Sequence, residues 1–144
     1  MAHQDKGHYA AKHPAATQLD EQIAELIRKK AKDNVITCVE AVSIAGETGK
    51  TIREVGVNLD LLETRISFCQ MGLFGHSPDK RVVRAAETVD ETLKQAIETR
   101  LQNGRLSCAD SWKIADQFNL PKMAVSRACE ALKIKIKPCQ LGAF

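Results

Sequence analysis

The chain carries one sequence pattern twice. When it is aligned with itself at a shift of 70 residues, segment 19–74 matches segment 89–144 without a gap, with 13 identities over 56 aligned positions. Both segments end on the pattern Cys-Gln-x-Gly-x-Phe. Self-similarity at a fixed spacing is typical of repeated structural units. We therefore expect two copies of one small domain, whose shared residues serve the fold or a shared chemistry.

The repeats define the expected domain boundaries. Residues 1–18 have no apolar periodicity and are predicted to form a flexible N-terminal tail, followed by the first repeat at 19–74, a linker at 75–88 and the second repeat at 89–144. A unit of 56 residues is near the lower size at which a chain buries enough apolar surface to fold alone. We therefore expect the copies to pack on each other or on a second chain.

Composition indicates an ordinary globular protein, with 27% charged and 44% hydrophobic residues. No apolar run approaches the length of a membrane span, and the N-terminus lacks the apolar core of a signal peptide. These features predict a cytoplasmic protein that does not bind membranes. The five cysteines, an odd number, argue against a disulfide framework.

Charge is distributed unevenly between the repeats. The first repeat carries 7 Lys and Arg against 9 Asp and Glu, a net charge of −2. The second repeat carries 9 against 6, a net charge of +3. If one copy binds a polyanion, the second is therefore the better candidate.

Each repeat is predicted to form a helix, a short strand, a helix, a turn, a helix and a strand. The first helices are expected to begin near Asp20 and Asp90, which can cap them, and the one in the second repeat to end at Asn103-Gly104. Apolar periodicity predicts the later helices over 39–48, 52–63, 109–118 and 122–132, with strands over 35–38, 65–68, 105–108 and 134–137. The expected fold class is mostly α with short β-strands.

The two later helices of each repeat resemble the helix-turn-helix of DNA-binding transcription regulators. That motif has a small residue where the helices cross, a residue that tolerates positive φ in the turn, and a β-branched residue on the second helix. These positions are filled by Ala45, Gly49 and Val55 in the first repeat and by Ala115, Asn119 and Val125 in the second. Because a strand that resembles a wing follows each motif, the resemblance implies two tandem winged-helix-like repeats.

The resemblance also implies which residues meet DNA. In such proteins the second helix of the motif enters the major groove, and its outward residues contact base edges and phosphates. In the second repeat the outward positions are Lys122, Met123, Ser126, Arg127 and Glu130. The following strand alternates lysines with isoleucines and suits backbone phosphates. The predicted DNA-binding residues are Lys122, Met123, Ser126, Arg127, Lys133, Lys135 and Lys137.

The first repeat departs from this pattern. Its outward positions include one cation, Arg53, one carboxylate, Asp60, and residues that offer little to a base edge. We expect Ile52 and Val57 to face a protein partner instead, with the first repeat supplying packing or oligomer contacts. Regulators of this kind commonly dimerise on two half-sites, so the resemblance implies a homodimer on double-stranded DNA.

The cysteines leave three interpretations open. Cys38 and Cys69 have the same spacing as Cys108 and Cys139, and the pairing of the flanking strands would bring each pair together. They are buried core residues, redox-sensitive pairs, or, if all four meet or a dimer brings two pairs together, a metal site. Cys129 has no counterpart and is expected in the core.

Nothing in the sequence favours catalysis. There is no glycine-rich phosphate loop and no histidine at a plausible spacing from a nucleophile, so neither an enzyme nor a cofactor is predicted. The sequence thus predicts a non-enzymatic transcriptional regulator that reads duplex DNA with its second repeat. The alternatives are a protein-protein interaction adaptor built on the same fold, or a thiol- or metal-responsive regulator.

Overall fold

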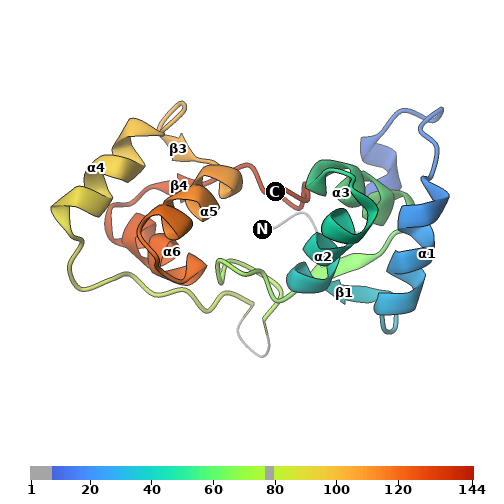
Figure 1. The fold of residues 1–144 in the computed structure, drawn as a ribbon, viewed down its shortest axis with the longest axis horizontal. Helices are drawn as coiled ribbons and strands as arrows, with labels where there is room; N and C mark the ends of the chain where they lie inside the picture. Colours follow the sequence, from blue (N-terminus) through green and yellow to red (C-terminus); the bar gives the residue numbers. More distant parts are fainter. Residues whose placement is uncertain (1–7, 77–79) are drawn as a thin grey trace. The chain divides into compact units, whose positions relative to one another are not determined.

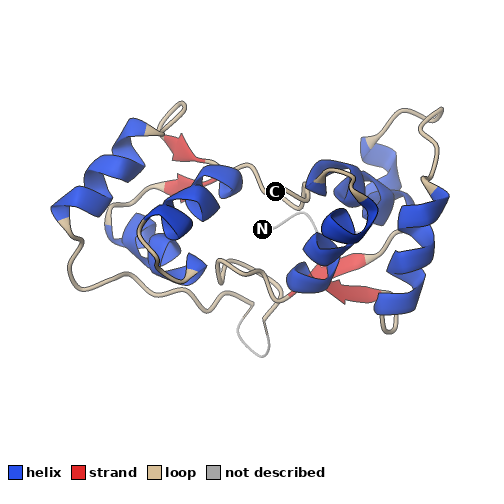
Figure 2. Cartoon of the chain, viewed as in Figure 1, coloured by secondary structure: helices blue, strands red, loops and turns tan. Residues whose placement is uncertain are grey.

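A computed structural model describes residues 8–76 and 80–144 (Figure 1). The fold is mostly helical with short strands, as predicted (Figure 2). The chain forms two compact units: unit 1 combines the chain up to Cys69 with Gln140–Phe144, and unit 2 comprises Gln70–Cys139. Residues 70–74, which close the first repeat, thus belong to unit 2, and Gln140–Phe144, which close the second repeat, belong to unit 1. No helix among the described residues is long and apolar enough to cross a membrane.

Both units contain a helix, a strand, two helices and a strand in the same order. Unit 1 begins with a short 3-10 helix, η2 (Tyr9–Lys12), and continues with α1 (Glu21–Lys30), β1 (Val35–Thr37), α2 (Cys38–Thr48), α3 (Ile52–Leu61) and β2 (Arg65–Ser67). Unit 2 contains α4 (Glu91–Thr99), β3 (Arg105–Leu106), α5 (Cys108–Gln117), α6 (Lys122–Ala131) and β4 (Lys135–Ile136).

The helices begin where capping side chains stand. The carboxylate of Asp20 accepts hydrogen bonds from the backbone N–H groups of Gln22 and Ile23, and that of Asp90 accepts one from Thr92, as predicted. α4 ends at Thr99, earlier than expected. Gln102 and Arg105 instead pair as an isolated antiparallel bridge. The Asn103-Gly104 pair forms the tight turn between them, and both of its residues have positive φ.

Each strand that precedes a motif pairs with the strand that follows it. β1 lies parallel to β2 with Ile36 opposite Ile66, and β3 lies parallel to β4 with Leu106 opposite Ile136. The parallel direction follows from the helical crossover between the strands. In the part of the chain that the structure describes, each sheet has these two strands only, so the lysine-bearing strand is not part of a hairpin wing.

The residues shared by the two repeats form the cores. The identical pairs Ile27 and Ile97, Ile44 and Ile114, and Val55 and Val125 are all nearly inaccessible to solvent. In the turn between the motif helices, Gly49 and Asn119 have φ values of 71° and 54°, the left-handed conformation that the sequence predicts there.

The described part of the N-terminal region differs from the expected flexible tail. Tyr9 in η2 is buried, and η2 packs against α3. Lys12 and His13 both contact the carboxylate of Asp60, at 3.0 and 2.8 Å, and the backbone N–H of Ala10 donates to Glu63. These contacts order residues that no local periodicity marks; residues 1–7 of the predicted tail lie outside the described residues.

Candidate nucleic-acid interface

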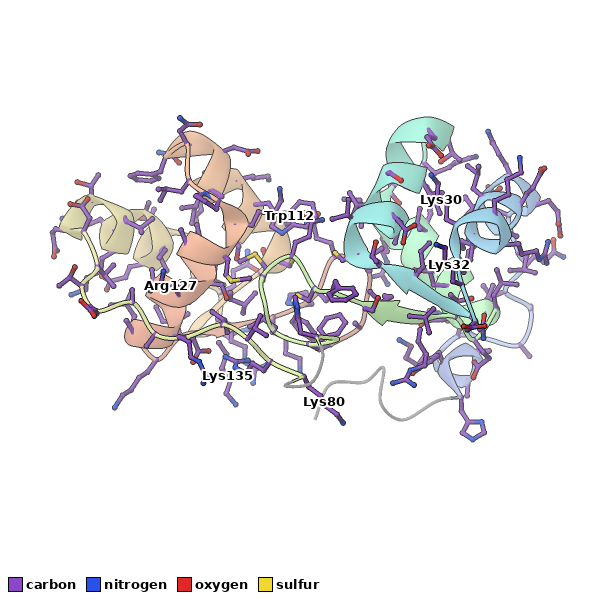
Figure 3. The ribbon with its side chains drawn as sticks, turned by 90° about the horizontal axis from the view of Figure 1, so that it is seen from below. Lys30, Lys32, Lys80, Trp112, Arg127 and Lys135 are labelled. Atoms are coloured by element: carbon purple, nitrogen blue, oxygen red, sulfur yellow. The ribbon has the colours of Figure 1, made fainter. Side chains whose placement is uncertain are left out.

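A row of exposed lysines follows α6. Lys133, Lys135 and Lys137 are exposed, whereas Ile136 between the last two is buried against the core. Of the three lysines, only Lys135 lies in β4, where strand alternation places its side chain outward as predicted. Lys133 is in the turn after α6, with positive φ, and Lys137 follows β4. Arg127 is exposed on α6, whose residues contact β4, so Arg127 and Lys135 come from neighbouring elements of unit 2 (Figure 3).

Lys122, the first residue of α6, is held over an aromatic ring. Its Nζ lies 4.7 Å from the centroid of the Trp112 ring on α5. A cation at this distance from the face of an indole is attracted by the ring quadrupole. The indole N–H of Trp112 is buried without a hydrogen-bond partner among the described residues. Trp112 therefore serves as a packing surface that positions a predicted phosphate contact.

Electrostatics favour an anionic partner for unit 2. Unit 2 carries 12 Lys and Arg against 8 Asp and Glu, a net charge of +4, whereas unit 1 carries 9 against 10, a net charge of −1. Within residues 8–76 and 80–144, no ion pair involves any of five predicted contact residues, namely Lys122, Arg127, Lys133, Lys135 and Lys137.

One of the predicted base-contact residues is not outward in this structure. Ser126 has no exposed surface, and Met123 is only half-exposed. The prediction that Ser126 is an outward residue is therefore wrong, whereas Met123 is half-exposed as Lys122 is. A helical pattern alone places Ser126 on the outer side of α6, but chain from outside the repeat covers that side.

The covering chain comes from two stretches before α4. A Cβ added to Gly72 would lie 3.0 Å from Met123 Cε, which shows how closely Gly72 approaches the helix. Arg81 forms an ion pair with Glu130, and the backbone N–H of Ala86 donates to the carbonyl of Arg127 at 3.0 Å. No local pattern in the sequence predicts that Arg81 or Gly72 lies at this face. Two signals were available: the closing pattern that both repeats share, and the small residues Gly56 and Ser126 at the same position of the second motif helix.

A shallow hollow lies beside the same helix. Its volume is about 340 Å³, and Arg127 of α6 and Asp90 and Leu93 near the start of α4 contribute to its lining. Arg127 is therefore shared between the cationic surface and this hollow.

The equivalent face of α3 in unit 1 is also covered. A Cβ added to Gly56 would lie 2.7 Å from the carbonyl carbon of Leu141 and 3.0 Å from its Cα. Ile52 and Val57 are half-buried, and the predicted outward residue Asp60 is buried beneath η2. The role of Ile52 and Val57 in binding a protein stays a prediction.

The cysteines lie largely inside the units. Cys38, Cys69, Cys108 and Cys129 are buried and Cys139 is half-buried, as the core interpretation expects for all but the last. The N–H of Cys108 donates to the carbonyl of Pro138, which brings it beside Cys139. No group of three or more His, Cys, Asp or Glu side chains among the described residues is arranged to hold a metal ion. Burial raises the pKa of the Cys129 thiol to about 12.

Comparisons of the chain with protein-family models, with curated proteins and with solved structures give no match.

Proposed function

We propose that unit 2 binds duplex DNA and that the protein is a non-enzymatic, cytoplasmic regulator of transcription. The observation that carries this proposal is the set of five cations on α6 and on segment 133–137 after it, which form no ion pair within the described residues. Cations without a carboxylate partner can neutralise phosphates without first breaking a salt bridge. Phosphate contacts supply most of the sequence-independent affinity for DNA.

The arrangement of these cations matches a backbone rather than a small anion. Three ammonium groups alternate along the segment Lys133 to Lys137, and Arg127 adds a guanidinium from the adjacent helix. Such a row follows a chain of phosphates, whereas a single phosphate would be held by convergent donors in a concave site. The half-exposed Lys122 adds a contact at the N-terminus of α6, where the helix dipole also favours an anion.

The test is fluorescence anisotropy of the full chain with a labelled duplex of random sequence, repeated over a series of salt concentrations. We expect affinity to fall steeply with salt. Replacing Lys133, Lys135 and Lys137 by alanine removes up to three phosphate contacts, so the slope of log K against log salt should become shallower by about 2.7.

The matched control removes three exposed cations from unit 1, with Lys29→Ala, Lys32→Ala and Arg53→Ala. This control changes the net charge by the same amount, and we expect its slope of log K against log salt to stay close to that of the wild type. No binding by the wild-type protein even at low salt, or equal losses in both triple variants, overturns the proposal. Sedimentation of the complex tests the proposed homodimer.

A second candidate is protein docking through unit 1, the adaptor function considered above. It is favoured by Val39 and Phe68, which are 58% and 52% exposed and are two of the three large apolar side chains that the described residues expose. Exposed apolar residues indicate a partner surface where they form one contiguous patch. A Val39→Asp variant that leaves all protein association unchanged rejects this candidate.

A further inference from the structure

The face of α6 that a helix-turn-helix presents to DNA bases is occupied in this structure. We call residues 71–72 and 81–86, which occupy it, the strap. The carbonyl of Gly72 accepts hydrogen bonds from the N–H groups of Val82 and Val83, at 2.9 and 3.1 Å, so the two stretches hold each other. The second stretch then runs beside α6 toward α4 (Figure 1).

The contacts of the strap lie around one serine. Met123 and Glu130 are three residues before and four residues after Ser126, so all three share one face of α6. Gly72 approaches Met123, and Arg81 pairs with Glu130. Between these contacts the side chain of Ser126 is fully buried.

The covered serine is unsatisfied. Its hydroxyl has no hydrogen-bond partner among the described residues. A buried hydroxyl without a partner destabilises the state that buries it, and exposure to water or to a base edge removes that penalty. The covered state of unit 2 therefore contains a polar group that favours its opening.

The equivalent cover in unit 1 has no such group. The residue aligned with Ser126 is Gly56, whose Cα is so close to Leu141 that a side chain would overlap the backbone of that residue. The Nζ of Lys12 also donates to the carbonyl of Gly142 at 3.0 Å. In unit 1 the cover thus approaches α3 too closely for a side chain at this position, whereas unit 2 has a polar side chain there.

We infer that the strap is an autoinhibitory cover, and that its release from α6 exposes Met123, Ser126 and Glu130 for contact with base edges. This inference rests on the proposed function. With the strap in place, DNA contacts are limited to phosphates bound by Lys122, Arg127 and the three lysines after α6, and binding has little sequence preference. With the strap released, α6 reads sequence. The apparent association constant for a specific site is then the intrinsic constant multiplied by the fraction of molecules in which the strap is open.

The first test uses two glycines of unit 2 with the same backbone conformation. Gly72 and Gly104 both have a φ of +75°, but a Cβ at Gly72 meets Met123, Val82 and Val83, whereas one at Gly104 meets nothing within 4 Å. Gly72→Ala should therefore crowd the contact between the strap and Met123 and shift the strap toward release, and Gly104→Ala controls for backbone strain. After selection from a random duplex pool, we expect Gly72→Ala to enrich one sequence and to bind it at least tenfold more tightly than Gly104→Ala does.

A second pair of variants covers the case in which Gly72→Ala fails to fold. Arg81→Gln breaks the ion pair with Glu130, while Arg84→Gln removes a nearby exposed cation for which the structure gives no ion pair. Both variants lose one positive charge, so a difference between their affinities for DNA reports the loss of the contact between the strap and Glu130. We expect Arg81→Gln to bind the selected sequence several-fold more tightly than Arg84→Gln.

Hydrogen exchange of the wild-type full chain supplies the remaining readout. The amides of Val82, Val83 and Ala86 are hydrogen-bonded in the closed strap, and we expect saturating selected duplex to accelerate their exchange. The inference that the strap is an autoinhibitory cover is overturned by either of two results. One is equal sequence preference within both pairs of variants, and the other is slower hydrogen exchange of these amides when DNA is bound. Absence of binding to any duplex by the wild type and by all four variants instead overturns the proposed function, and the strap as its regulator with it.

Discussion

Lys122 and Trp112 connect the two helices of the motif in unit 2. The ammonium group of Lys122 lies 4.7 Å from the centroid of the indole ring, so the first residue of α6 is held against α5. The ring keeps the cation near the N-terminus of α6, which itself favours a negatively charged ligand. One contact thus links the packing of the motif to its proposed phosphate binding.

This contact makes tryptophan emission a reporter of Lys122. Trp112 is the only tryptophan of the chain, and the lysine covers its ring. Lys122→Ala should shift the emission to longer wavelength, increase quenching by acrylamide and lower the free energy of unfolding by about 0.5–1 kcal/mol. If Lys122 moves to a phosphate on binding, duplex DNA should increase quenching in the wild type. The same quenching in wild type and variant contradicts the observed contact.

Two helical glycines should respond in opposite directions to alanine. Gly56 on α3 has no room for a side chain beside Leu141, so Gly56→Ala forces a backbone shift and should destabilise unit 1 by about 1–3 kcal/mol. Gly46 on α2 has nothing within 4 Å of its Cβ position, so Gly46→Ala should raise stability by up to about 1 kcal/mol. Urea denaturation measures both. Equal effects would show that Leu141 does not pack on α3 in solution.

Local patterns predicted the fold well because the interactions that form its elements are local. Asp20 caps α1, Asn119 adopts the turn conformation, and Ile44 and Ile114 are buried at the spacing that helices require. Each of these outcomes depends on residues within about a turn of the chain. The sequence therefore located the helices to within a few residues at their ends.

The exposure of the candidate site depends on distant chain and was not predictable in the same way. Periodicity places Ser126 outward, yet it is buried between two contacts of distant chain, that of Gly72 with Met123 and that of Arg81 with Glu130. The useful signal was a pair of small residues, Gly56 and Ser126, in the same register of the second motif helix. Small residues at matched positions mark a close approach of another segment, but they do not identify that segment.

Acid should weaken the N-terminal cap of α2. The backbone N–H of Thr37 donates to Glu40, and this hydrogen bond, with a second from the Thr37 hydroxyl, lowers the pKa of Glu40 below its ordinary value of 4.5. Because the folded pKa is the lower one, the stabilisation is complete above pH 4.5 and is lost as pH falls through the folded pKa.

Glu40→Gln removes this titration while keeping a hydrogen-bond acceptor. We expect the variant to lose less free energy of unfolding than the wild type between neutral pH and about pH 3, measured by urea denaturation at each pH. A wild-type pH dependence that the variant reproduces in full would mean that the capping box does not form in solution.

Cys129 should react with thiol reagents only after unit 2 unfolds. Its side chain is 1% exposed, and burial raises its pKa to about 12, so almost no thiolate is present at about pH 8. A disulfide reagent such as DTNB counts reactive thiols before and after denaturation. We expect wild type and Cys129→Ala to give the same count in the native state, and the wild type to give one more when denatured.

A lower native count in Cys129→Ala would mean that α6 leaves the core of unit 2 in solution, because packing against that core is what buries this thiol. The strap inference requires the opposite: the outer face of α6 opens while its inner face, marked by Cys129 and Val125, stays packed.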